Sequence, residues 1–385
     1  MHLAEAGGPS QHVQPWLAAL TRCGSLEVVV PGVGRVADRY APFATTTVLD
    51  YEPLLFPRNP LKLIRVVMRL ARELAMFYRH FRLRRPDVVV VVTSVLPSAL
   101  LAARLARVKT VVYVGEIYDK GFVRNRPRAV ASRLMKVLIE RVPDAVVCCS
   151  RTVAAQFDGR NGSRVTTIYP GVDPGRFDGD RNRLRVYYGL EQADPCLAVV
   201  GNITRGRGQD ILIRALPDLR AALPAVHCLL VGTPLARPVD LAYLRELERL
   251  AESLGVRDAV TFTGFVDQVD DVYAAADIVV NPARVNEALG RVALEALASG
   301  RPVVATRVGA VTEALRPDED ALIIEPDDPD ALAAAVLRLW QDEALRERMV
   351  ASGRARVLKH FSEAQGVRSF GAVLDGVVAR SRGGA

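Results

Sequence analysis

The chain has 385 residues, half of them apolar, and a formal net charge of +8, and this length suits two domains of ordinary size. No run reaches 18 uninterrupted apolar residues and no basic segment with an apolar core opens the chain, so the sequence predicts neither a membrane span nor secretion. The five cysteines lack metal-ligand spacing and predict reduced thiols in a cytoplasmic protein, and basic residues scattered without a recognition motif argue against a nucleic-acid partner.

Short Val-rich runs alternate with amphipathic stretches along the chain. In the first half they predict strands at 26–30, 87–92, 110–114 and 144–148, and in the second half at 196–200, 226–231, 259–262, 277–280 and 302–306. Near-continuous apolar strands of this kind are typical of parallel sheets covered on both faces. The segment 171–180 between the two series is rich in Gly, Pro and Asp and predicts a hinge.

These patterns predict an α/β protein of two doubly wound, Rossmann-like domains that face each other across a cleft. We expect the first domain at residues 1–180, joined by a C-terminal helix at 362–382 that crosses back to it. The second domain is expected at residues 181–361.

The chain opens with Met1–Glu5 before Gly7 and Gly8, which is short for a central first strand. We expect either a shortened start or a strand of five residues. The two glycines let the backbone come close to a phosphate at the entry to a helix that contains His12. A Gly-Gly pair by itself is a weak indication of such a site.

The stretch 61–85 predicts a basic amphipathic helix. Its cations fall on one stripe: Lys62, Arg65, Arg69, Arg72 and Arg79. Its apolar residues largely form the other face: Leu63, Val66, Val67, Leu70, Leu74 and Phe77. Such a helix can lie on an anionic membrane surface, and a packed helix with a solvated basic face explains the pattern equally well.

The predicted strand at 110–114 is followed by two acidic residues, Glu116 and Asp119. Either carboxylate could orient or deprotonate an acceptor hydroxyl, or hold a cationic acceptor. A solvated loop is the alternative. The chain has only five histidines, and no nucleophile–His–acid triad can be read from the sequence.

Glu287 and Glu295 lie eight positions apart where a predicted strand leads into a helix. On one helix they would be about 80° apart in azimuth and roughly 12 Å apart along the axis, too far to share a small ligand. We therefore expect Glu287 in the preceding loop and Glu295 one to two turns inside the helix. The backbone amides of Leu289, Gly290 and Arg291 would then point into the same cleft and suit a phosphate. A nucleotide-sugar fits this arrangement.

This segment resembles the signature of the family-4, or group 1, retaining glycosyltransferases, which carry two Glu separated by seven residues in an E-P-F-G context. The resemblance implies the GT-B fold of two Rossmann-like domains. It also implies that Glu287 approaches the transferred sugar and that Glu295 holds the ribose hydroxyls. Ala288 and Leu289 stand in place of the usual Pro-Phe, which changes the shape of the segment but not its backbone chemistry.

The turn at 201–208 resembles the family's G-R-x4-K-G turn, whose two cations hold the diphosphate. Arg207 stands in the Lys position and keeps the charge. Asn202 replaces the Arg, which removes one charge-assisted contact worth on the order of 1.5–3 kcal/mol. Arg205 is a candidate substitute from a neighbouring position, and a solvated Arg-Gly loop is the alternative reading of the whole turn.

Three further segments resemble the family. Gly264 and Phe265 match the strand end where backbone groups meet the nucleobase. The turn 309–313 corresponds to G-G-x-x-E with Ala310 in place of the second glycine, and a structural role is expected for its glutamate. The entry 7–13 matches G-G-x-x-x-H-V, which implies that Gly7 and Gly8 contact the donor and that His12 lies on the acceptor side. Many relatives carry a His near 115–116, where this chain has Gly-Glu.

The resemblance implies a retaining, metal-independent hexosyltransferase without a cofactor. Its donor would be a nucleotide-sugar, a UDP-sugar first and a GDP-sugar second. The acceptor hydroxyl would belong to a bacterial cell-envelope glycan, a lipid-linked sugar or a small metabolite, with peripheral contact to the inner membrane face if helix 61–85 binds lipid. The alternatives are a non-catalytic nucleotide-sugar-binding subunit, a sugar-nucleotide epimerase and a glycogen-phosphorylase-like enzyme of the same architecture.

Overall fold

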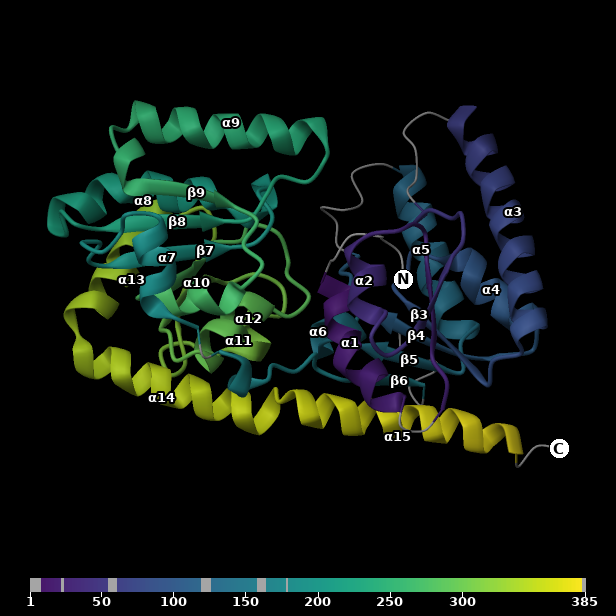
Figure 1. Ribbon diagram of the computed structural model, residues 1–385. Coiled ribbons are helices and arrows are strands. Elements are labelled where there is room, and N and C mark those ends of the chain that lie inside the picture. Colours follow the sequence, from purple (N-terminus) through teal and green to yellow (C-terminus); the bar gives the residue numbers. More distant parts are fainter. Residues whose placement is uncertain are drawn as a thin grey trace. The chain divides into compact units, whose positions relative to one another are not determined.

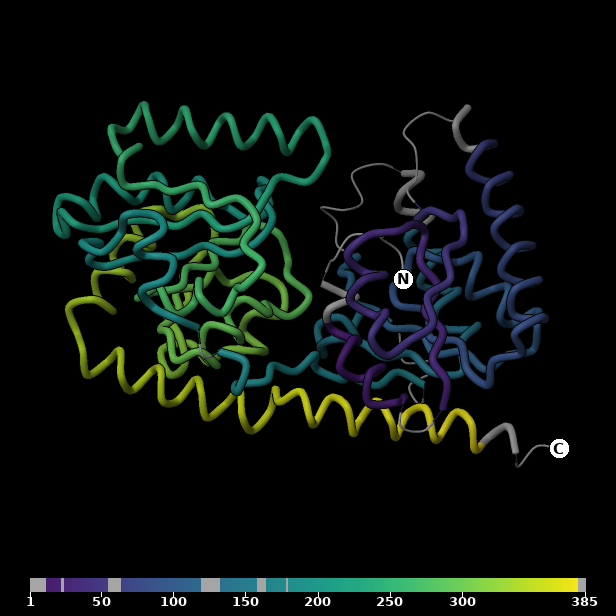
Figure 2. Tube along the Cα trace, viewed as in Figure 1, coloured from purple at the N-terminus to yellow at the C-terminus, as the bar shows by residue number. Residues whose placement is uncertain are grey.

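A computed structural model describes residues 8–21, 24–54, 61–118, 126–157, 164–177 and 179–382. The backbone divides into two units, and each is described by itself below. The first contains Met1–Gly171 and Glu363–Ala385, and the second contains Val172–Ser362. Figure 1 labels the elements of both units, and the chain trace in Figure 2 can be followed from purple at the N-terminus to yellow at the C-terminus.

The main sheet of the first unit has four parallel strands in sequence order. These are β3 (Val88–Val92), β4 (Lys109–Val114), β5 (Ala145–Cys148) and β6 (Val165–Thr167). Two further strands, β1 (Glu27–Val30) and β2 (Thr45–Val48), pair parallel to each other in a separate sheet. β2 and β6 were not predicted, and both are short, Thr-containing segments without a fully buried residue.

The helices of the first unit include one from each end of the chain (Figure 1). They are α1 (Gly8–Leu20), α2 (Arg35–Tyr40), α3 (Leu61–Arg84), α4 (Pro97–Leu105), α5 (Arg126–Arg141), α6 (Arg151–Ala154) and α15 (Glu363–Arg382). α1 and α15 pack through Trp16 and Phe370, whose stacked ring centroids lie 5.1 Å apart. Gly366 allows this approach, because a Cβ there would lie only 2.6 Å from the indole Nε1 of Trp16.

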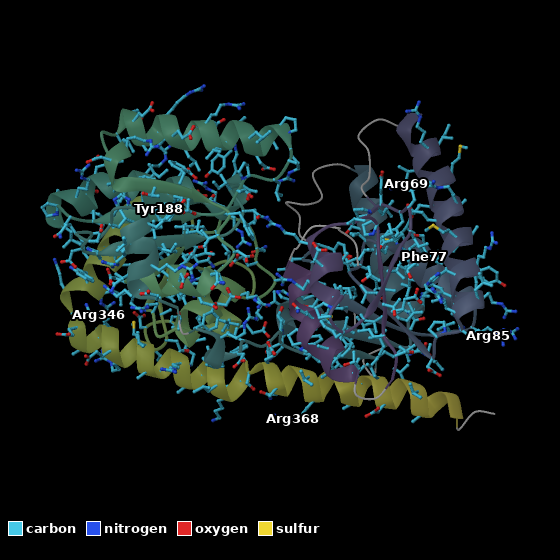
Figure 3. The ribbon with its side chains drawn as sticks, in the orientation of Figure 1. Arg69, Phe77, Arg85, Tyr188, Arg346 and Arg368 are labelled. Atoms are coloured by element: carbon cyan, nitrogen blue, oxygen red, sulfur yellow. The ribbon has the colours of Figure 1, made fainter. Side chains whose placement is uncertain are left out.

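Helix α3 corrects the sequence-based division of its faces. Arg69 does not lie on a solvated basic stripe: it pairs with Glu52 and lies 3.5 Å from Glu73, which is fully buried. Val67, assigned to the packed face, is 58% exposed. Phe77 does pack inward as predicted, and Figure 3 labels both Arg69 and Phe77 on this helix.

The second unit contains a six-stranded parallel sheet in the order β12-β11-β10-β7-β8-β9. Its strands are β7 (Cys196–Val200), β8 (His227–Val231), β9 (Val260–Gly264), β10 (Ile278–Asn281), β11 (Val303–Thr306) and β12 (Leu322–Ile324). The chain fills one half of the sheet from β7 outward and then returns to start the other half at β10. The order therefore reverses between β7 and β10, and in open α/β sheets ligands bind outside the carboxyl ends of the strands at such a point.

Helices surround this sheet. They are α7 (Arg181–Tyr187), α8 (Gln209–Ala222), α9 (Pro238–Ser253), α10 (Val269–Ala275), α11 (Arg291–Ala298), α12 (Val311–Ala314), α13 (Pro329–Gln341) and α14 (Glu343–His360). α14 packs on α11 at Gly353, where a Cβ would lie 2.6 Å from a methyl group of Leu297. The predicted α/β class with parallel sheets is confirmed in both units.

His227 at the start of β8 makes the second unit sensitive to acid. Its Nε2 lies 2.8 Å from the Thr261 hydroxyl, and burial lowers the pKa of the imidazole to about 4. An unfolded His titrates near 6.5, so the unfolded chain binds more protons between these two values and stability falls as pH falls through that window. We expect roughly 1–2 kcal/mol to be lost between pH 7 and pH 4, after allowing for solvent screening of a partly exposed ring.

Denaturant unfolding at several pH values measures this loss. His227→Gln keeps a hydrogen-bonding group but does not titrate in this range. Between pH 7 and pH 4 its free energy of unfolding should therefore fall by roughly 1–2 kcal/mol less than that of the wild type. Equal pH slopes for the two proteins would show that other groups cause the acid sensitivity.

Candidate functional site

The carboxyl ends of the first three strands of the second unit are each marked by a glycine. Gly201 directly follows β7, Gly232 directly follows β8, and Gly264 is the last residue of β9. Their φ angles of 140°, 135° and 69° favour glycine. A Cβ at Gly232 would lie 2.2 Å from the carbonyl oxygen of Gly201, and the Gly232 N–H donates to the Gly264 carbonyl over 2.9 Å. The close approach excludes a side chain at Gly232, and none of the three positions carries one, so backbone groups form this part of the edge.

The loop between β10 and α11 carries Glu287, and the helix itself carries Glu295. α11 begins at Arg291 after Gly290, whose φ is 79° and which supplies no side-chain cap. Glu287 therefore precedes the helix and Glu295 is its fifth residue, as the spacing predicts. An uncapped helix start presents backbone N–H groups to an anion.

Glu287 joins the two loops that flank the point where the strand order reverses. Its Oε1 forms an ion pair with Arg207, the last residue of the 3-10 turn Arg205–Arg207 that follows β7. Its Oε2 accepts a 2.7 Å hydrogen bond from the side-chain amide of Asn281, the last residue of β10. The Glu287 side chain is 10% exposed and that of Arg207 is 36% exposed. Two of the predicted site residues thus meet.

The backbone around Glu287 is fixed by the turn that follows β11. The Ala310 N–H donates to the Glu287 carbonyl over 2.9 Å, and the Gly309 N–H donates to Asn286 Oδ1 over 2.8 Å. Gly309 has a φ of 54°, and a Cβ there would lie 2.2 Å from the carbonyl oxygen of Glu287. The turn therefore sets where the Glu287 carboxylate can lie.

Glu295 has a protein partner on each carboxylate oxygen. The Tyr273 hydroxyl donates to Oε2 over 2.7 Å, and Arg291 donates to Oε1 over 2.5 Å. Burial and the nearby Glu295 raise the pKa of Tyr273 well above its usual range, which keeps the phenol protonated as the donor. The Glu295 carboxylate is thus held in one orientation, with lone pairs remaining for further donors.

The other residues predicted to bind the donor follow the strands at the carboxyl edge of this sheet, and they differ in how far they are exposed to solvent. Phe265 follows β9 and is 51% exposed. Leu289 is buried, whereas Ala288 is partly exposed. Asn202 follows Gly201, and its carbonyl accepts a 3.0 Å hydrogen bond from Gln209 at the start of α8.

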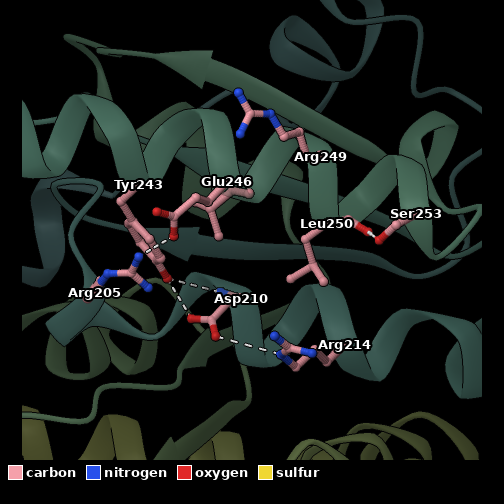
Figure 4. A pocket seen from close by; sticks show the side chains of 9 residues that line it. Arg205, Asp210, Arg214, Tyr243, Glu246, Arg249, Leu250 and Ser253 are labelled. Carbon is pink, nitrogen blue, oxygen red and sulfur yellow. Dashed lines mark hydrogen bonds and ion pairs between the residues drawn. The ribbon is translucent and has the colours of Figure 1, made fainter.

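Arg205 does not take the place of the missing cation at position 202. It pairs with Glu246 of α9 and lies over the ring of Tyr243, 5.0 Å from its centroid (Figure 4). The Tyr243 hydroxyl in turn donates to Asp210 over 2.5 Å. These residues border a cavity of about 350 Å³ next to α8 and α9, further lined by Arg214, Leu247, Arg249, Leu250 and Ser253.

In the first unit, Glu116 lies just beyond β4. Its carboxyl accepts hydrogen bonds from the hydroxyls of Thr93 and Ser94 and from the Gly115 N–H, the last two over 3.1 Å each. Burial raises the pKa of Glu116, against the opposing effect of the two hydroxyls. Thr93 is buried with a φ of 134°, a strained conformation for a β-branched residue of the kind that collects at functional sites.

The remaining first-unit candidates are only partly described. Gly8 is the first residue of α1, and His12 Nδ1 lies 2.8 Å from the Tyr113 hydroxyl of β4. Gly7 and Asp119 lie outside the described residues. Gln156 fixes the backbone beside Glu116: its amide donates to the Glu116 carbonyl over 3.1 Å.

Sequence reasoning missed four residues of these sites: Asn281, Tyr273, Thr93 and Ser94. Asn281, Thr93 and Ser94 come directly after predicted strands, and Tyr273 lies in helix α10. The carboxylate that each of them contacts is determined only by folding. Among the described residues, no three or more His, Cys, Asp or Glu side chains gather as a metal site would require. None of the described helices is long and apolar enough to cross a bilayer.

Comparison with known families gives two matches that together cover most of the chain. The model described as "Glycosyltransferase Family 4" matches residues 6–176, and the model described as "Glycosyl transferases group 1" matches residues 180–356.

Two curated relatives illustrate the sequence similarity. The lipopolysaccharide core biosynthesis mannosyltransferase LpsB of Rhizobium meliloti is 32% identical over 247 residues, which is 63% of this chain and 68% of that protein. The D-inositol 3-phosphate glycosyltransferase of Salinispora tropica is 34% identical over 280 residues, covering 67% of this chain and 56% of that protein. The chain thus spans about half to two thirds of such relatives.

A solved structure resembles nearly the whole chain. Anabaena HepE in complex with UDP-glucose superposes with a TM-score of 0.83 at 20% identity, covering 98% of both chains. WaaG, described as a glycosyltransferase of lipopolysaccharide biosynthesis, gives a TM-score of 0.69 at 18% identity over 95% of this chain and 96% of that one. At these identities the likeness concerns the fold, which is the predicted GT-B fold.

Proposed function

The chain belongs to the group 1 glycosyltransferases, and from that membership and the site geometry we propose that it transfers a hexose from a nucleoside-diphosphate sugar to a hydroxyl acceptor. The proposal includes retention at the anomeric carbon and no requirement for a metal. The main observation that supports the proposal is that Arg207 and Glu287 pair with each other next to the start of α11, at the point where the strand order reverses.

In the proposed reaction, residues 181–361 bind the donor. The diphosphate lies at the start of α11 beside Arg207, and these groups stabilise the charge of the leaving nucleotide. Glu287 eases the positive charge that develops at the anomeric carbon. Glu295, held by Tyr273 and Arg291, accepts hydrogen bonds from the ribose hydroxyls.

Residues 1–180 with the helix 362–382 are proposed to bind the acceptor. Glu116 is the candidate for orienting or deprotonating the acceptor hydroxyl, since burial raises its pKa and so its basicity. The hydroxyls of Thr93 and Ser94 fix its orientation. His12 and Asp119 are proposed to flank this acceptor site, in line with the resemblance.

The donor proposed first is a UDP-sugar, because a protein of the same fold binds UDP-glucose, and the second is a GDP-sugar, because a mannosyl relative is described as GDP-mannose-dependent. The proposed acceptor is a cell-envelope glycan, a lipid-linked sugar or a small metabolite, the first two in keeping with the lipopolysaccharide and phosphatidylinositol relatives. A non-catalytic binding subunit would bind the donor without turning it over, and an epimerase would change the sugar without releasing nucleotide.

Calorimetric titration with UDP, GDP and ADP tests the donor site. We expect one nucleotide to bind in the micromolar range and Glu295→Ala to weaken it tenfold to a hundredfold, because a charge-assisted hydrogen bond to the ribose is lost. Glu347→Ala, the same substitution on the exposed surface of α14, should bind normally. Binding that Glu295→Ala leaves unchanged would place the ribose elsewhere.

The outer face of α3 favours a second proposal, that this helix contacts an anionic membrane from the cytoplasmic side. Among its exposed apolar side chains are Ile64, Val67 and Met68, at 63%, 58% and 67% exposure. The exposed Arg65 and Arg72 lie within about one turn of them on the same side of the helix, and Arg72 also pairs with Asp50. The exposed Arg79 lies on this side about three turns further along. An apolar strip next to guanidinium groups suits the interface of a bilayer with anionic headgroups.

Vesicle co-sedimentation tests the contact. We expect binding to phosphatidylglycerol-containing vesicles, with the double change Val67→Glu and Met68→Glu weakening it at least tenfold. Leu358→Glu, at another exposed apolar position that is 53% exposed on α14, should bind like the wild type. Equal, weak sedimentation of all three proteins would favour a packed helix with a solvated basic face.

A further inference from the structure

Two arginines of one short turn have different partners. Arg205 and Arg207 both belong to the 3-10 turn Arg205–Arg207 after β7. Arg205 is 59% exposed and pairs with Glu246, which is 45% exposed, so this is a surface ion pair. Arg207 pairs with Glu287, whose side chain is only 10% exposed. The second pair lies inside the proposed donor site and the first lies outside it.

Arg207 has an ion-pair partner within the protein itself. Its guanidinium lies beside Gly201, where a Cβ would be 3.4 Å from its Nε, and Glu287 is its ion-pair partner within the described residues. A diphosphate at the start of α11 would need the same guanidinium. One cation therefore serves two anions that compete for it.

We propose that the donor diphosphate replaces Glu287 as the counter-ion of Arg207, so that donor binding itself releases the Glu287 carboxylate toward the sugar. This inference rests on the proposed function. No covalent bond changes: one ion pair is exchanged for another within the second unit.

Asn281 gives the released carboxylate a defined position. Its amide donates to Glu287 Oε2, the oxygen that Arg207 does not hold, and Asn281 itself is buried. The Glu287 backbone is held independently by Ala310. Release from Arg207 thus frees one oxygen while the other stays hydrogen-bonded, and Asn281 acts as a positioning residue.

The exchange has a measurable consequence for affinity. A nucleotide that must displace a partly buried carboxylate from its cation binds more weakly than one that finds the cation unoccupied, by the free energy of the displaced contact. Glu287→Gln keeps the shape of the side chain and an oxygen that can accept the hydrogen bond from the Asn281 amide. It removes the negative charge that competes with the diphosphate for Arg207. We expect it to bind UDP, or whichever nucleotide the wild type prefers, about tenfold more tightly.

Calorimetric titration with UDP, GDP and ADP of Glu287→Gln, Arg207→Gln and the double variant tests the exchange. The gain from Glu287→Gln should disappear when Arg207 is also replaced, because there is then no cation to release. Glu246→Gln, which frees the neighbouring Arg205 instead, is the matched control and should leave the affinity unchanged. Glu287→Ala provides a second variant with the same expected gain, and circular dichroism checks that each protein is folded.

Each outcome decides between specific possibilities. A gain that persists without Arg207 would mean simple charge repulsion by Glu287, and no gain at all would mean that the ion pair does not compete; either result overturns the exchange and leaves the proposed function standing. If the wild type and all variants bind none of the three nucleotides, the proposed function itself is wrong and the exchange falls with it.

Discussion

Glu287→Ala is expected to lower the rate of sugar transfer by about 10²–10³-fold without weakening nucleotide binding. The carboxylate is placed to act on charge that develops only in the transition state, and interactions of that kind change turnover rather than ground-state affinity. Its loss should therefore appear as a lower kcat, while the Kd for nucleotide falls about tenfold because the charge that competes for Arg207 is removed as well. Nucleotide release from UDP-glucose and GDP-mannose, followed in a coupled assay, measures the rate.

Glu325→Ala provides the control, since Glu325 is a glutamate of the same unit that is 69% exposed and pairs with Arg307 at the surface. It should release nucleotide at the wild-type rate. If Glu287→Ala keeps that rate, another group acts at the anomeric carbon. A wild-type protein that binds nucleotide but releases none from any donor would support the non-catalytic binding subunit instead.

The placement of Glu287 and Glu295 could be predicted from sequence because it depends on local rules. A strand end, a glycine and an amphipathic helix follow each other within about 20 residues, and each has a clear pattern. The long strands were predictable for the same reason, since five successive valines at 88–92 favour little else. The sequence positions of the two glutamates therefore already fixed their relation to the helix start.

The partners of these carboxylates could not be predicted in the same way. Tyr273 lies 22 residues from Glu295, and Thr93 lies 23 residues from Glu116. At these separations no helical or strand periodicity and no short motif relates the two residues of a pair. Thr93 and Glu116 meet because β3 and β4 are neighbouring parallel strands that end at the same edge of the sheet. Tyr273 and Glu295 lie on helices α10 and α11 and meet only in the folded second unit. Asn281 could not be recognised as a site residue from its type, since an Asn that follows a strand is also typical of a turn.

Helix α3 shows another limit of prediction from sequence. The period of its cations predicted a basic stripe, but the buried Glu73 and the preceding loop residue Glu52 draw Arg69 inward. Periodicity assigns a face to a residue only when nothing elsewhere in the fold offers it a charged partner. Exposed apolar residues of this helix, such as Val67, can be identified only once the face that packs against the rest of the unit is known.

Gly309→Ala is expected to destabilise the second unit by about 3 kcal/mol and to disturb the donor site as well. A positive φ of 54° already disfavours a side chain, and the added Cβ would lie 2.2 Å and 2.5 Å from the backbone oxygen and nitrogen of Glu287. Because these are backbone atoms, the loop must move as a whole and carry the Glu287 carboxylate away from Arg207. Denaturant unfolding and nucleotide release measure the two effects.

Gly255→Ala separates the clash from the cost of the backbone conformation. Gly255 has a φ of 67°, and among the described residues, its two chain neighbours aside, no atom lies within 4 Å of where its Cβ would be. Its substitution should therefore cost only about 1 kcal/mol and leave nucleotide release unchanged. The difference between the two variants then measures how firmly the turn after β11 holds the Glu287 loop. Equal destabilisation by both would mean that the loop yields easily, and Glu287 would then owe its position to Arg207 and Asn281 alone.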